Sequence, residues 1–137
     1  MPAEIKWLPK TFVKELNNHD CKIPSFTQWN GGIKIKLHGI IVGEFAESGQ
    51  YDIAVMCNNK VLIHWGGHAN CPSEINNLGE TLSIPDEGEI QRYLKRYGNK
   101  EWPPELSHDP IGMYNLGKSS FYQYCHNGKW LFSDGAD

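Results

Sequence analysis

No run of apolar residues in this chain approaches the roughly 18 residues that a membrane-spanning helix needs. The first six residues, Met1 to Lys6, also lack the basic and then apolar layout of a secretory signal peptide. These two absences predict a cytoplasmic protein that does not enter a membrane. The composition, 39% hydrophobic and 21% charged, is typical of a folded globular domain rather than a disordered chain.

Cysteine is sparse and irregularly spaced. The chain has four, none of them in a C-x-x-C pair: Cys21, Cys57, Cys71 and Cys125. Because the cytoplasm keeps thiols reduced, we expect four buried free cysteines. An even number also permits two disulfides, an alternative that the missing secretory signal disfavours.

Recognisable catalytic motifs are missing as well. The sequence contains no dinucleotide-binding fingerprint, Walker motif, HExxH or GxSxG. A formal net charge of −3 argues against direct binding to nucleic acid, which requires a basic surface. The leading expectation is therefore a binding protein rather than an enzyme.

Basic side chains are nearly absent between Leu37 and Gln91. This stretch contains one lysine, Lys60, and eight acidic residues, which together give it a formal charge of −7. Three of the acids lie at the start of a predicted helix, where the helix dipole favours them. The other five have no such explanation: Glu44, Glu47, Asp52, Glu74 and Glu80. We expect these five to form an acidic surface that attracts a basic partner, less strongly as salt rises.

Two segments are predicted to be helical. Residues 9–18 begin at a proline, which suits a first helical turn, and Phe12, Val13 and Leu16 form one apolar stripe. Residues 86–97 carry a capping box of Asp86 and Glu89. Apolar residues then recur at helical spacing: Ile90, Tyr93, Leu94 and Tyr97.

Strand patterns fill the region 33–65. Residues 33–38 alternate strictly between apolar and polar, 40–42 continue as strand, and 51–57 and 60–65 form a hairpin around Asn58-Asn59. Its register pairs Val55 with Leu62 and Ile53 with His64. Both faces are mostly apolar, which predicts strands in the middle of a sheet with a layer packed on each side.

A second hairpin is predicted at 121–133, because Asn127-Gly128 is a strong two-residue turn between apolar strands. Residues 21–30, 66–79 and 100–117 are predicted to be loops. We therefore expect a single compact α+β domain over residues 1–137, with antiparallel sheet from 33–65 and 121–133 packed against two helices. The pattern leaves open whether the hairpins share one sheet or form two.

One cluster has the residue types of a metal site: Cys57, His64, His68 and Cys71. Thiolate and imidazole suit tetrahedral zinc, but the spacing C-x6-H-x3-H-x2-C matches no known zinc module. Alternatively, His64 is a core side chain, because its predicted register places it on an apolar face. Cys71 is also a candidate nucleophile next to His68. A weaker acid–base grouping combines Lys34, Lys36, His38 and Glu44.

The sequence thus predicts a small cytoplasmic binding protein or inhibitor whose acidic surface engages a basic protein. By analogy of charge and size, the partner is a toxin or a nucleic-acid-handling enzyme, as for an immunity protein or a phage inhibitor. Trp102, in a proline-rich loop, is the predicted aromatic anchor. The alternative function is a metal-binding protein or a hydrolytic enzyme that uses the loop from His64 to Cys71, and a third possibility is a subunit of a larger assembly.

Overall fold

The computed structural model describes residues 8–21, 25–29, 32–37, 39–97, 102–103, 105–115 and 119–135. These residues form two helices, α1 (Lys10–Asn18) and α2 (Glu87–Tyr97), and ten strands in three antiparallel sheets. The strands are β1 (Ser25–Trp29), β2 (Gly32–Leu37), β3 (Ile40–Gly43), β4 (Asp52–Cys57), β5 (Lys60–His64), β6 (Glu74–Asn76), β7 (Thr81–Ser83), β8 (Ile111–Asn115), β9 (Ser119–His126) and β10 (Lys129–Asp134).

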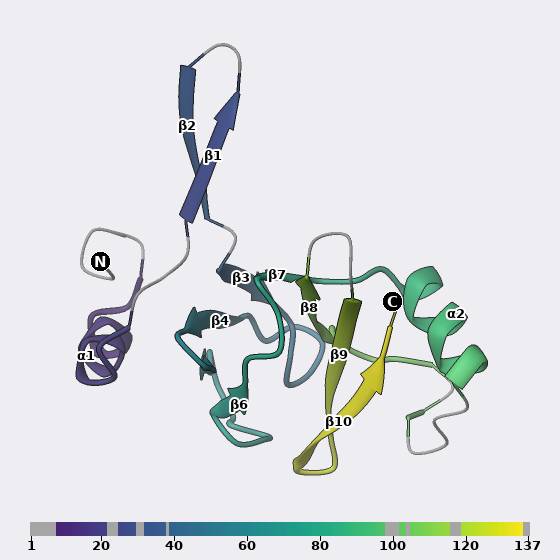
Figure 1. The fold of residues 1–137 in the computed structure, drawn as a ribbon. Helices are drawn as coiled ribbons and strands as arrows, with labels where there is room; N and C mark the ends of the chain where they lie inside the picture. Colours follow the sequence, from purple (N-terminus) through teal and green to yellow (C-terminus); the bar gives the residue numbers. More distant parts are fainter. Residues whose placement is uncertain are drawn as a thin grey trace.

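The molecule has four layers. One four-stranded sheet has the order β3-β4-β5-β6, and the other has the order β10-β9-β8-β7. Figure 1 shows both sheets between the helices, with α1 beyond the first sheet and α2 beyond the second. The strands β1 and β2 form a two-stranded sheet that extends away from these layers (Figure 1). The fold is therefore a single compact α+β fold with a helix on each outer face.

The largest core lies between the two four-stranded sheets. Alternate residues of β4, β5 and β6 meet alternate residues of β7 and β8 there, because successive side chains of a strand point to opposite faces. The buried residues of this core are Phe45, Ala54, Met56, Val61, Ile63, Ile75, Leu82, Ile111 and Met113. The alternate side chains of the same strands point away from this core, toward the outer faces of the two sheets, where the helices lie.

Each helix packs on its own sheet. Phe12 and Leu16 of α1 are fully buried, and they join Val55 and Leu62 on the outer face of the first sheet. On the second sheet, Ile90 of α2 joins a different cluster, whose other members are Trp102, Tyr122, Tyr124 and Leu131. Burying a side chain such as Phe12 stabilises the fold by about 1.5–3 kcal/mol.

Both predicted helices and both predicted hairpins are confirmed. The central hairpin has the expected register, with Ile53 opposite His64 and Val55 opposite Leu62. Both hairpin turns contain residues with positive φ, at Asn58, Asn127 and Gly128, as such turns require. The prediction of a covered layer on each side of β4 and β5 is also confirmed, by α1 on one side and the second sheet on the other.

Three strands lie where loops were predicted, and these predictions were wrong: β1 lies within residues 21–30, β6 within 66–79 and β8 within 100–117. A fourth strand, β7, lies just before α2 in a segment for which the sequence made no prediction. β6 and β7 have only three residues each, so no periodic pattern marks them, and each is a strand because it pairs with a distant partner. The predicted strand residue His38 lies outside the described residues.

The cysteines are paired, which corrects the prediction of free thiols. Cys21 is bonded to Cys57, with their Cα atoms 4.8 Å apart, and Cys71 is bonded to Cys125, with their Cα atoms 6.0 Å apart. The first bond joins the chain after α1 to β4. The second joins the loop after β5 to β9, and therefore connects the two four-stranded sheets.

Within the described ranges, no helix is long and apolar enough to cross a membrane.

Candidate functional site

A small acidic cleft of about 170 Å³ opens where three segments meet. The first follows β3, the second precedes and begins α2, and the third precedes β8. The residues that line it are Glu44, Pro85, Glu87, Leu106, Ser107, His108, Asp109 and Pro110. Three of these are carboxylates, and no Lys or Arg is among the described lining residues. The cleft therefore favours a cation.

Two reciprocal hydrogen bonds hold two of the three segments together. The backbone N–H of Glu44 donates to Asp109 Oδ2 at 2.9 Å, and the backbone N–H of Asp109 donates to the carbonyl oxygen of Glu44 at 2.7 Å. Glu44 Oε1 also accepts the backbone N–H of Gly49 at 2.8 Å. Each acid is thus fixed in position, and each keeps oxygen lone pairs that these bonds do not use.

A buried carboxylate organises the turn that carries Glu44. Asp52 is fully buried, and its Oδ2 accepts the backbone N–H groups of Phe45 and Ala46 at 3.0 and 3.1 Å. Its Oδ1 accepts Gln50 Nε2 at 2.7 Å and the backbone N–H of Gly66 at 2.8 Å. Gly66 is required there, since a Cβ would lie 2.0 Å from the carbonyl oxygen of Tyr51.

At the other side of the cleft, Ser107 and His108 form a polar chain. Ser107 Oγ lies 2.9 Å from His108 Nδ1, and His108 Nε2 lies 2.6 Å from the carbonyl oxygen of Cys125. Tyr124 Oη accepts the backbone N–H of Ser107 at 3.2 Å and lies 3.2 Å from His108 Nδ1. The His108 ring also stacks on Tyr124, with ring centroids 4.3 Å apart. The imidazole is therefore held by both nitrogens and by one face.

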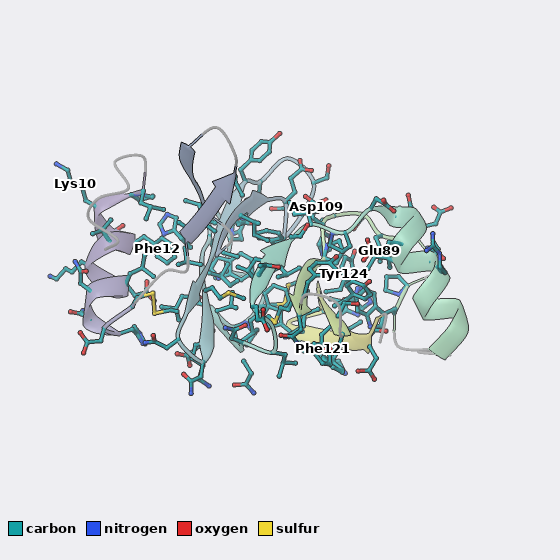
Figure 2. The ribbon with its side chains drawn as sticks, turned by 45° about the horizontal axis from the view of Figure 1, so that its top comes forward. Lys10, Phe12, Glu89, Asp109, Phe121 and Tyr124 are labelled. Carbon is teal, nitrogen blue, oxygen red and sulfur yellow. A yellow bond between two sulfur atoms is a disulfide. The ribbon has the colours of Figure 1, made fainter. Side chains whose placement is uncertain are left out.

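A second polar cluster anchors α2 to its sheet. Tyr114 Oη donates to Glu89 Oε2 at 3.0 Å, and Tyr122 Oη donates to the same oxygen. Burial first, and then the hydrogen bond to Glu89, raise the pKa of Tyr114 well above its usual 10.0. Figure 2 shows Glu89, Tyr124 and Asp109 on the α2 side of the molecule, far from Lys10 on α1. Glu89, Tyr114 and Tyr122 hydrogen-bond to one another and do not line the cleft.

Of the predicted acidic surface, only Glu44 lines the cleft. Glu47, Glu74 and Glu80 are exposed, but they lie in the turn after β3, on β6 and just before β7, outside the cleft. The five acids therefore do not form one compact site. Whether Glu47, Glu74 and Glu80 contact a partner stays a prediction.

Two residues predicted to bind a partner are instead internal, which corrects the prediction. Asp52 accepts four hydrogen bonds and exposes none of its surface, so it organises the fold rather than meeting a partner. Trp102 is only 5% exposed; its Nε1 donates to the carbonyl oxygen of Phe132 at 3.3 Å, and its ring stacks on Tyr124. Trp102 thus packs the outer face of the second sheet.

The predicted metal ligands do not form a site, which is also a correction. Cys57 and Cys71 belong to different disulfides, so neither has a thiolate to donate, and Cys71 cannot act as a free nucleophile. His64 packs against Phe12, with ring centroids 5.1 Å apart, as expected for a core side chain. His68 is exposed in its loop. Among the residues that the structure places, no three His, Cys, Asp or Glu side chains are grouped to hold a metal.

Sequence reasoning missed most of the cleft. The helix dipole explains Glu87 without a binding role, and Ser107, His108 and Asp109 lie in a segment whose sequence predicts only a loop. Three adjacent residues with hydroxyl, imidazole and carboxylate groups, flanked by prolines, were the available signal. Nothing local, however, indicated that Glu44 and Asp109 would meet across 65 positions.

Comparison with known proteins does not assign the fold or the site. No protein-family model, no curated protein and no solved structure matches this chain.

Proposed function

We propose that this protein binds a basic protein partner, and that the acidic cleft receives a lysine or arginine side chain of that partner. The observation that carries the proposal is the convergence of Glu44, Glu87 and Asp109 from three separate segments on one cleft without a basic lining residue. A guanidinium or ammonium group fits such a site because carboxylates form charge-assisted hydrogen bonds with it.

The distribution of charge supports a steered encounter. Exposed acids lie next to the cleft in sequence, at Asp86 and Glu105, whereas α1 at the far end carries the exposed Lys10 and Lys14. The acids at and beside the cleft therefore attract a basic partner to this surface. Such attraction raises the association rate and weakens as salt screens it.

The two disulfides bear on where this binding takes place. Structural disulfides persist in oxidising compartments and are rare in the cytoplasm. The pairing of all four cysteines therefore favours an oxidising compartment over the predicted cytoplasm. Of the two predicted partner classes, a basic toxin that acts in such a compartment fits this setting better than a cytoplasmic nucleic-acid-handling enzyme.

The test is a pull-down of the tagged protein from its source cells at low and high salt, with mass spectrometry of the captured proteins. The cleft variant combines Glu44→Gln, Glu87→Gln and Asp109→Asn. We expect wild type to capture a basic protein at low salt only, and the cleft variant to bind it about tenfold more weakly or worse, a loss of about 1.4 kcal/mol.

A matched control removes the same three charges elsewhere: Glu15→Gln, Asp20→Asn and Asp134→Asn, all at exposed positions outside the cleft and outside the predicted acidic surface. Its net charge equals that of the cleft variant, so general steering falls equally in both. If the control variant loses as much affinity as the cleft variant, the cleft is not the binding site. If wild type captures no basic protein, the proposed function is wrong.

A further inference from the structure

We propose that Ser107 and His108 form a nucleophile–base pair that hydrolyses esters carrying a positive charge. This activity is separate from partner binding, although it uses the same cleft. Nucleophilic catalysis by serine requires a base within hydrogen-bond reach of the hydroxyl, and a third group that orients the base. Here Ser107 provides the hydroxyl, His108 is the base next to it, and the carbonyl of Cys125 orients His108.

The hydrogen bonds fix the tautomer of His108. A backbone carbonyl can only accept, so the 2.6 Å contact with Cys125 requires a proton on His108 Nε2. In the neutral imidazole, Nδ1 then carries the lone pair, and it faces Ser107 Oγ at 2.9 Å. The stacked ring of Tyr124 prevents the imidazole from turning away. This is the tautomer that a general base for Ser107 needs.

Ser107 is placed to react, because it is exposed and lines the cleft. Its Oγ attacks the ester carbonyl carbon while His108 Nδ1 takes the hydroxyl proton. The tetrahedral adduct expels the alkoxide, which receives that proton, and the acyl group stays on Ser107 Oγ. Water then gives a proton to His108 Nδ1 and attacks the acyl carbon. Ser107 Oγ recovers the proton as the carboxylic acid leaves.

The surrounding carboxylates define the substrate. The carboxylates of Glu44, Glu87 and Asp109 line the same cleft and oppose the negative charge that develops on the reacting oxygen. A cationic group on the substrate offsets that repulsion. The backbone N–H groups of Ser107 and Asp109 are already bonded, to Tyr124 Oη and to the Glu44 carbonyl, and do not form an oxyanion hole. We therefore expect activated esters to react and amides to be inert.

The experiment uses two fluorophosphonates of equal length, one ending in a quaternary ammonium group and one neutral. Attack by Ser107 Oγ on phosphorus expels fluoride, and the phosphonyl adduct is located by mass spectrometry. We expect a single adduct at Ser107, formed about tenfold faster or more with the cationic probe. Ser107→Ala should abolish labelling, and His108→Gln should slow it by about 10²-fold.

Ser48→Ala is the control, because Ser48 is also exposed but lies outside the cleft, and it should label at the wild-type rate. A thermal melt of each variant confirms that it folds. Glu87→Gln, an exposed position, should reduce the preference for the cationic probe without removing the adduct. Absence of an adduct at Ser107 overturns the proposal, and equal rates for the two probes overturn the assignment of the substrate class.

Discussion

The two halves of this molecule have the same architecture, a four-stranded antiparallel sheet covered by one helix, but they attach the helix by different chemistry. In the first half, α1 inserts Phe12 and Leu16 among the aliphatic side chains of β4 and β5. In the second half, α2 buries Ile90 beside aromatic rings, and Glu89 accepts hydrogen bonds from Tyr114 and Tyr122.

This difference also separates the two halves by the kinds of side chain that they contribute to the cleft. Apolar packing depends on shape and volume, and the side chains that α1 buries, Phe12 and Leu16, carry no polar group. The α2 half gathers hydroxyl, imidazole and carboxylate groups, and the acidic cleft lies at the junction of this half with the first sheet. The first half thus contributes Glu44 to the wall of the cleft, whereas the second half contributes its hydroxyl and imidazole groups.

The largest expected effect comes from the apolar half. Phe12→Ala removes a fully buried ring and should lower the free energy of unfolding by about 3–5 kcal/mol, because a cavity remains beneath α1. Urea denaturation measures the loss. Thr11→Ala, at an exposed position of the same helix, should change stability by less than about 0.5 kcal/mol. A small loss for Phe12→Ala would mean that α1 does not pack as described.

A smaller effect is expected at the connection between the halves. Replacing Cys71 and Cys125 together by serine should lower the free energy of unfolding by about 2–4 kcal/mol, because the bond no longer restricts the unfolded chain. The equivalent Cys21 and Cys57 variant should lose a similar amount of stability. The two bonds close loops of 36 and 54 positions, and the effect of a disulfide on the unfolded chain changes only slowly with loop length.

The two disulfide variants should differ in hydrogen exchange. Loss of the Cys71–Cys125 bond should increase exchange in both the loop after β5 and β9, because that bond joins the sheets. Loss of the Cys21–Cys57 bond should affect only the chain after α1 and β4. If the two variants show the same pattern of hydrogen exchange, neither disulfide couples the stability of one half to that of the other.

The same contrast explains what sequence analysis could predict of the fold. The register of β4 and β5 was predictable because both strands are long, alternate clearly and are joined by the short turn Asn58-Asn59. The separation into two sheets was not, because it depends on β6 and β7. These strands of three residues carry no pattern of their own and are defined by pairing with β5 and with β8.

The acidic cleft was less predictable still. An excess of acids between Leu37 and Gln91 was visible, but burial decides which acids matter, and burial depends on long-range packing. Asp52 shares a strand face with Ala54 and Met56, so its position already pointed inward. Glu44 and Asp109 meet only because the turn after β3 packs against the loop before β8.

The smallest effect at neutral pH, and the most specific to the α2 half, is expected for Tyr114→Phe. The change removes one hydrogen bond to Glu89 and should cost about 1 kcal/mol at pH 7. Its pH dependence is distinctive. Folding raises the pKa of Tyr114 above the unfolded value of 10.0, through burial, Glu89 and Tyr122. The unfolded chain therefore loses this proton first, and the stability that Tyr114 contributes is present below pH 10 and lost as pH rises above it.

Tyr114→Phe should accordingly make the decline in stability above pH 10 shallower than in wild type. Urea denaturation at pH 8 and at several values between about 10 and 11.5 measures the difference. Tyr51→Phe is the matched control, because Tyr51 is 67% exposed and should leave the slope unchanged. If Tyr114→Phe and Tyr51→Phe decline in parallel with wild type, Tyr114 is not held against Glu89, and α2 is attached by apolar contacts much as α1 is.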